Sequence, residues 1–237
     1  MLKPIKMKKQ QDPKELIMDM LKDKACLKQD IFENTTESFK QLKLVLADII
    51  DEVRDLFGDS DNRVRLEYND KGDYEAQITI GGDVLYFYMH TNVFKFESTN
   101  SLWRTTYLEE DPNRGYVGVI NIYNFLADSI KYNRVNDSGY LIARIFVNKE
   151  DHFLVQGKRQ LGFLYNDFTN ASLNKEGLKG IVQSAIIYTL DFDLFTPPYQ
   201  DVQEVSVQAI EAVSQHLNIK TGKRLGFKFQ SDNDSIE

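Results

Sequence analysis

The spacing of apolar residues changes twice along the chain and divides it into helical and extended parts. Between Thr36 and Phe57 apolar side chains recur every three or four residues, which is the period of an α-helix. From Arg63 they recur every second residue, which is the period of a β-strand, and after Pro112 the helical period returns. The pattern predicts an α+β protein in which helices cover an antiparallel sheet.

Two helices are predicted near the N-terminus. The first begins at Asp12-Pro13, because Asp can accept hydrogen bonds from free amides and Pro fits the first helical position, and it runs to about residue 33. The second covers about residues 36–57 and ends at Gly58, a residue that tolerates a left-handed conformation. Its apolar seam is expected to pack on the sheet or on the first helix, with dimerisation as the alternative. The seam consists of Phe39, Leu42, Leu46, Ile49, Val53 and Leu56.

Three antiparallel strands are predicted next, at about residues 63–69, 74–80 and 84–97. Apolar and polar residues alternate in the first two strands, so each is expected to bury one face. The third strand begins with a run that is apolar on both sides, so both of its faces are expected to be covered there. A polar connection is expected at residues 98–111.

A helix is predicted after Asp111-Pro112, because this pair repeats the start signal of Asp12-Pro13. The β-branched residues between positions 117 and 122 favour a strand instead. We prefer the helix, because it places the apolar side chains on one side. That side consists of Tyr116, Val119, Ile120, Tyr123, Leu126, Ala127 and Ile130.

Two further strands are predicted at residues 140–147 and 152–157. The first of them is apolar on both faces, so it is expected near the middle of the sheet. A helix is predicted from about Asn174, and its stretch from 181 to 190 is apolar nearly all round, which indicates deep burial. A last amphipathic helix is expected at about residues 201–217.

The elements are thus predicted in the order α-α-β-β-β-α-β-β-α-α, with about five strands in the sheet. We expect residues 1–35 to form a basic leader and a surface helix, residues 36–229 a single α+β domain, and residues 230–237 a disordered acidic tail. Over about residues 36–195 this order resembles the small α+β fold of type III secretion chaperones and related bacterial proteins. The resemblance implies a sheet backed by helices that binds other proteins and often dimerises.

Composition narrows the classes of function. The 237 residues are 42% apolar and 27% charged, as in an ordinary globular protein, and the net charge of −7 opposes an overall electrostatic attachment to nucleic acid. The single cysteine, Cys26, cannot form an internal disulfide and fits a reducing compartment. No stretch approaches the roughly 20 apolar residues that span a bilayer. We therefore expect a cytoplasmic protein without a membrane or nucleic-acid partner.

The sequence contains no catalytic or metal-binding motif of a known type. His90, His152 and His216 lie on separate predicted elements without a second ligand at helical or hairpin spacing, so no metal site and no cofactor are expected. A phosphate-binding loop and a nucleophile elbow are also missing.

Aromatic and basic residues supply the candidate binding surface. Aromatic side chains bury a large area at low entropic cost, which suits recognition of a protein, although packing in the core is the alternative interpretation. The basic pair Lys158-Arg159 recurs in the sequence as Lys223-Arg224. The alternative interpretation of Lys158-Arg159 is that it forms a solvated strand end. The candidate binding residues are Tyr86, Tyr88, Trp103, Arg104, Tyr107, Lys158 and Arg159.

One alternative is catalytic. Asp137 precedes a predicted strand, and Gln156 and Lys158 lie one residue apart near the end of the next strand. This arrangement resembles the restriction-endonuclease-like nucleases and implies a magnesium ion and an oriented water. The sequence departs from that pattern, because Asp137 lies in the turn before its strand and Gln156 replaces a second carboxylate.

From these observations we expect a non-enzymatic protein, of the chaperone or adaptor kind, that binds a protein partner and forms a homodimer. The first alternative is a metal-dependent nuclease that uses Asp137, Gln156 and Lys158. The second is a domain that binds a small molecule in a pocket between the sheet and the helix at 181–190.

Overall fold

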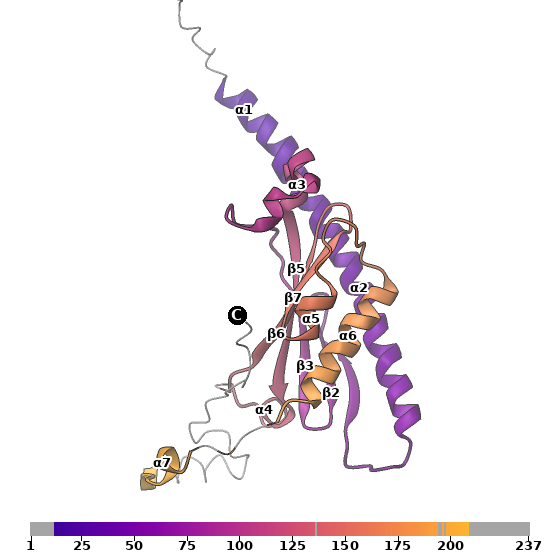
Figure 1. The fold of residues 1–237 in the computed structure, drawn as a ribbon, viewed down its shortest axis with the longest axis vertical. Coiled ribbons are helices and arrows are strands. Elements are labelled where there is room, and N and C mark those ends of the chain that lie inside the picture. Colours follow the sequence, from indigo (N-terminus) through magenta and orange to yellow (C-terminus); the bar gives the residue numbers. More distant parts are fainter. Residues whose placement is uncertain (1–11, 136, 194–195, 197, 209–237) are drawn as a thin grey trace, which may run out of the picture.

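The protein has an α+β fold, with one antiparallel sheet and two long helices on the same face of it (Figure 1). The computed structural model describes residues 12–135, 137–193, 196 and 198–208. The predicted basic leader, most of the last predicted helix and the predicted acidic tail lie outside these residues.

A single long helix replaces the two helices predicted near the N-terminus. It consists of α1 (Pro13–Met20), a π-helical turn (Leu21–Ala25) and α2 (Cys26–Phe57). Both predicted ends are confirmed. Asp12 accepts a hydrogen bond from the amide of Lys14 at 3.2 Å, and Gly58 has a φ of +52°. The N-terminal part of this helix projects beyond the sheet (Figure 1).

The predicted interruption between residues 33 and 36 is wrong because the polar side chains there bond within the helix or across to the sheet. The hydroxyls of Thr35 and Thr36 donate to the carbonyls of Ile31 and Phe32, four residues earlier, at 2.6 and 2.8 Å. Such bonds let residues that favour helix caps lie in a helix interior. Asn34 donates to the carbonyl of Lys149, beyond the end of a strand, at 3.0 Å.

In the described part of the chain, the sheet has seven antiparallel strands instead of about five. Six follow one another in space in the order of the sequence, and the short β4 pairs beside them with β5. The strands are β1 (Leu66–Asp70), β2 (Glu75–Ile80), β3 (Asp83–Met89), β4 (Phe94–Lys95), β5 (Tyr116–Leu126), β6 (Tyr140–Val147) and β7 (Phe153–Gly157). The strand predicted at 140–147 is therefore an interior strand, but β3 and β5 are the central ones.

The largest correction concerns Tyr116–Leu126, which was expected to be helical and is the central strand β5. The Asp111-Pro112 signal is present, because Asp111 accepts from the amide of Asn113 at 2.9 Å, but it caps only a 3-10 turn at Pro112–Gly115. The β-branched residues after this turn then pair on both sides, with β3 and β6. The predicted element order is wrong at this point, so the resemblance to secretion chaperones loses its basis.

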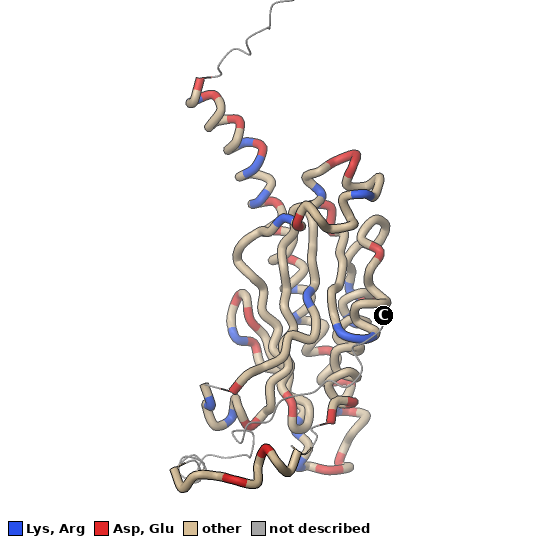
Figure 2. Tube along the Cα trace, turned by 60° about the vertical axis from the view of Figure 1, so that its left-hand side comes forward, with Lys and Arg blue, Asp and Glu red and all other residues tan. Residues whose placement is uncertain are grey.

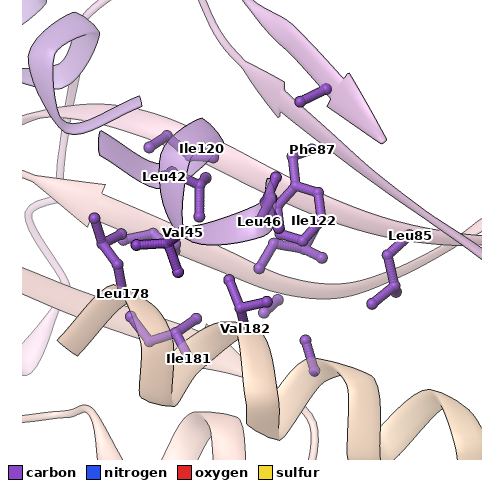
Figure 3. Packing of buried hydrophobic residues seen from close by; sticks show 14 of the residues in the cluster. Leu42, Val45, Leu46, Leu85, Phe87, Ile120, Ile122, Leu178, Ile181 and Val182 are labelled. Atoms are coloured by element: carbon purple, nitrogen blue, oxygen red, sulfur yellow. The ribbon is translucent and has the colours of Figure 1, made fainter. Parts of the chain in front are cut away.

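Helices α2 and α6 (Lys175–Leu190) cover one face of the sheet (Figure 1). The side chain of Asn174 accepts from the amide of Gly177 at 2.8 Å, which confirms the predicted start of α6. Side chains from both helices meet alternate strand residues in one apolar core (Figure 3). These include Leu42, Val45, Leu46, Leu85, Phe87, Ile120, Ile122, Leu178, Ile181 and Val182. Most of the predicted seam of α2 is thus buried within the chain itself.

Helix α2 approaches β5 most closely at Gly118. A Cβ atom at this position would lie 2.0 Å from Thr35 Oγ1, which is far inside van der Waals contact. Only glycine allows this spacing between helix and strand, so Gly118 fixes how close α2 lies to the sheet.

A smaller second core lies beside β4 and the start of β5. It contains Tyr107, Leu108, Val117 and Phe168, with Trp103 packed against it. Short helical elements complete the described chain: a 3-10 turn at Ser101–Arg104, α3 (Thr106–Glu110), α4 (Ala127–Lys131), α5 (Gln160–Leu164) and α7 (Tyr199–Val202). Among the described residues, no helix combines the length and the apolar character that crossing a bilayer requires.

We predict that Phe39→Ala lowers the free energy of unfolding by about 3–5 kcal/mol, because the Phe39 ring is fully buried between α2 and the sheet. The matched control is Leu56→Ala on the same helix, where the side chain is 88% exposed and the expected change is within about 0.5 kcal/mol. Urea denaturation followed by circular dichroism measures both values. Equal losses for the two variants would contradict this packing.

Candidate functional site

The sheet face opposite α2 and α6 carries polar and aromatic side chains. Strand residues alternate between the two faces, so Leu85, Phe87 and Met89 point to the helices while Tyr86 and Tyr88 point to the opposite face. We call this opposite side the open face, because neither α2 nor α6 lies on it (Figure 1).

A groove of about 890 Å³ crosses the open face over β5, β6 and β7. Outside these strands, its walls are formed by residues of the segment from His90 to Asn100 and by Gly162 and Asn166. The groove is open to solvent rather than enclosed. Its volume lies within the range of roughly 300–1,000 Å³ that is typical of ligand sites.

The groove floor contains a polar row that runs across three strands. Asn121 on β5 is paired with Arg144 on β6, and Arg144 is paired with Gln156 on β7. Arg144 donates a hydrogen bond to the side-chain oxygen of Gln156. Tyr88 continues the row on β3, because its register partner is Asn121.

An apolar row lies next to the polar row, two residues along each strand. Val119 is paired with Phe146, and Phe146 with Leu154. Phe94 and Phe96 on the groove wall add to this apolar half. The floor therefore offers hydrogen-bonding groups on one side and an apolar surface on the other.

The charges around the groove are few. Lys95 on the wall lies 5.1 Å from the ring centres of both Trp103 and Tyr116, and Glu97 follows it. Elsewhere acidic and basic residues are interspersed, and the strands carry few charged positions (Figure 2).

On the neighbouring strands, the Tyr86 hydroxyl donates a hydrogen bond to the carboxylate of Glu75. Burial, together with this bond and the charge of Glu75, raises the pKa of Tyr86 to about 12. The hydroxyl therefore stays protonated and remains a donor to Glu75 at neutral pH.

The structure divides the predicted aromatic cluster between two places. Tyr86 and Tyr88 lie on the open face, half-buried beside the groove. Trp103 donates to the carbonyl of Glu97 at 2.8 Å and packs against the second core, while Arg104 next to it is exposed.

Tyr107 lies in the second core, where it is 8% exposed. Its hydroxyl donates to Glu150 at 2.9 Å and accepts from Asn148 at 2.9 Å, and its ring stacks on His152 at 4.9 Å. Arg114 also lies over this ring, 4.3 Å from its centre. These contacts describe a residue that holds the end of the sheet together.

Lys158 and Arg159 lie between the end of β7 and the start of α5. Arg159 forms an ion pair with Asp191 at 2.5 Å and lies over the ring of Tyr188. The echo of this pair at Lys223-Arg224 falls outside the described residues.

Asp137 and Gln156, two of the three residues of the nuclease alternative, bond to different partners. Asp137 accepts from Ser129 at 2.6 Å and lies 3.4 Å from Arg134, in the segment before β6. Gln156 lies on β7 and bonds to Arg144. In the part of the chain that the structure describes, no group of three or more His, Cys, Asp or Glu residues is placed to hold a metal ion. The nuclease interpretation stays a prediction, and these contacts give it no support.

The interface between α6 and the sheet is closely packed, since Leu178, Ile181, Val182 and Ala185 are at most 1% exposed. A small cavity of about 100 Å³ lies at its end, between Tyr188 and Asn124. The side-chain oxygen of Asn124 is buried without a hydrogen-bond partner. This cavity is much smaller than a typical ligand pocket.

The sequence reasoning missed the groove residues Asn121, Arg144, Phe146 and Leu154. One signal was present, because Arg144 is the single charged residue in the otherwise apolar run 140–147. A charged residue within such a strand needs either a partner or an open face.

We predict that Tyr107→Phe lowers the free energy of unfolding by about 1–3 kcal/mol, because it leaves the buried amide of Asn148 and the carboxylate of Glu150 without the hydroxyl. Tyr88→Phe on the open face is the matched control, with an expected change within about 0.5 kcal/mol. Chemical denaturation measures both. A Tyr107→Phe variant as stable as the wild type would contradict a structural role.

We also predict that lowering the pH destabilises the end of the sheet where Asp111 and Glu150 lie. The Lys149 ammonium lowers the pKa of Asp111; burial favours the neutral form of Glu150, but Arg114 and Tyr107 together lower its pKa. A lowered folded-state pKa stabilises the fold above the unfolded value near pH 4, and this stabilisation is lost as the pH falls through the folded value.

Asp111→Asn should therefore show a smaller loss of stability on acidification below about pH 4 than the wild type. Asp55→Asn on the exposed side of α2 is the control and should follow the wild type. Thermal unfolding at a series of pH values distinguishes the two cases, and parallel curves for all three proteins would argue against the effect.

Comparison with known proteins gives no match, either to a protein-family model, to a curated protein or to a solved structure. The choice of function therefore depends on the geometry and chemistry of the groove.

Proposed function

We propose that the protein is a non-enzymatic binding protein and that its groove holds an extended segment of a partner polypeptide. The observation that carries this proposal is the open groove of about 890 Å³, with its paired polar and apolar rows, on the sheet face that α2 and α6 leave uncovered. A groove that is open to solvent suits an extended chain that lies along the strands. A small molecule is usually held in a pocket that buries most of its surface.

The edges of the sheet also favour binding of the partner in the groove over addition of a partner strand to an edge. The outward amides of Phe153 and Val155 on β7 already donate to the carbonyls of Ala171 and Tyr165, at 3.1 and 2.8 Å. At the other edge, Arg54 of α2 donates to the carbonyl of Leu66 on β1 at 2.9 Å. A partner that adds a strand would compete with these bonds, whereas the groove on the open face needs no such exchange.

We predict that random peptides displayed on phage and selected on the full chain bind in this groove. A photo-reactive amino acid at position 154 should cross-link to the selected peptides, because Leu154 lines the groove, whereas the same group at position 44 on the outer side of α2 should not.

Leu141→Ala should weaken the selected peptides by about 10-fold, because Leu141 lines the groove and loses apolar contact area, while Leu44→Ala should not change their affinity. Both leucines are exposed, at 39% and 58%, so neither change should unfold the protein. A library that yields no binder, or binders that cross-link equally from both positions, would refute the proposal.

A further inference from the structure

Arg144 lies in the middle of the polar row and has unused hydrogen-bonding capacity. Its side chain is half-buried, it donates to Gln156, and its guanidinium carbon lies 5.4 Å from the centre of the Phe146 ring. A guanidinium group has five N–H donors, and within the described chain no ion pair is formed by Arg144. A charge in such a groove is an attachment point for an anion.

The neighbours of Arg144 also offer donors. The side-chain oxygen of Gln156 is taken by Arg144, so its amide nitrogen is left to donate. Asn121 is paired with Arg144 on the other side, and its side chain is 8% exposed. Within the described residues it makes no side-chain hydrogen bond. A carboxylate accepts several hydrogen bonds at once, so this row is complementary to an acidic side chain.

The apolar row has a fixed distance from this donor row. The backbone positions of Val119, Phe146 and Leu154 lie two residues along their strands from Asn121, Arg144 and Gln156, which is about 7 Å in a β-sheet. In an extended peptide, side chains two residues apart point to the same side and are separated by the same distance, whereas adjacent side chains point to opposite sides.

We infer that the groove recognises an acidic residue two positions from a large apolar residue in an extended segment of the partner, with Arg144 binding the carboxylate. This inference rests on the proposed function and specifies the partner's chemistry. Nucleic acid fits less well, because a phosphate backbone requires several cations, and the groove wall carries Glu97 beside Lys95.

The test uses the peptide library of the preceding section with the full chain. Selected sequences should be enriched in Asp or Glu two positions from Phe, Leu, Ile or Trp. For one such peptide, Arg144→Gln should weaken binding roughly 10- to 100-fold, because a charge-assisted, bidentate contact is lost. Arg144→Lys should restore part of the affinity, since the charge remains but the paired geometry does not.

Three controls isolate the contact. Replacing the acidic residue of the peptide by its amide should remove the sensitivity to Arg144→Gln, and moving it next to the apolar residue should weaken binding to the wild type. Arg63→Gln, on a side chain that is 86% exposed, should leave the affinity unchanged.

Peptides that bind in the groove without acidic enrichment, or that bind Arg144→Gln as tightly as the wild type, would overturn this inference and leave the proposed function intact. If no peptide bound to the wild-type protein, both this inference and the proposed function would be overturned. A single-stranded oligonucleotide that binds with the same dependence on Arg144 would also overturn it, because the partner would then be a nucleic acid.

Discussion

The packing of α2 across the central strand β5 is the contact on which the rest of the fold depends. Gly118 lets the helix lie directly on the strand at Thr35, and the buried side chains of α2 then fill the layer above β2, β3 and β5. Helix α6 completes that layer beside α2, so one face of the sheet is closed (Figure 1). Within residues 12–208, apart from the undescribed positions, the opposite face receives no helix of comparable length. The site is therefore a consequence of how both long helices are placed, because they share one side of the sheet.

The register of the antiparallel sheet then decides which chemistry meets on the open face. Asn121, Arg144 and Gln156 are far apart in the sequence and form a row because β5, β6 and β7 pair at these positions. A shift of one residue in any pair would turn its side chains to the helix face, where a guanidinium would be buried in the apolar core. The same pairing that satisfies the backbone thus keeps Arg144 in the groove. Fold stability and the proposed recognition depend on one register.

Local signals in the sequence predicted the outer parts of the fold better than its centre. Asp12-Pro13 and Asp111-Pro112 carry the same capping chemistry, and both cap a turn, but the first opens a long helix and the second only a 3-10 turn. What differs is the tertiary environment: the β-branched residues after Gly115 gain two strand partners, which no local pattern reveals. The groove was missed for the same reason, since Arg144 and Asn121 become neighbours only through this pairing. Tyr86 and Tyr88 were chosen as candidate binding residues because both are aromatic and lie on one predicted strand.

The overall charge and the local charge of the groove act on a partner in opposite directions. A net charge of −7 repels an acidic segment at long range. At ordinary ionic strength, salt largely screens this repulsion at distances beyond about 10 Å. Arg144 acts at contact distance, where the interaction between two charges is screened less by salt. In the proposed complex, the long-range field would therefore slow the approach of acidic chains in general, and the contact would favour those that carry a large apolar side chain two positions from the carboxylate. Selectivity in such a complex would come from the combination, because the acidic and the apolar group each add a contact that a segment lacking either one cannot make.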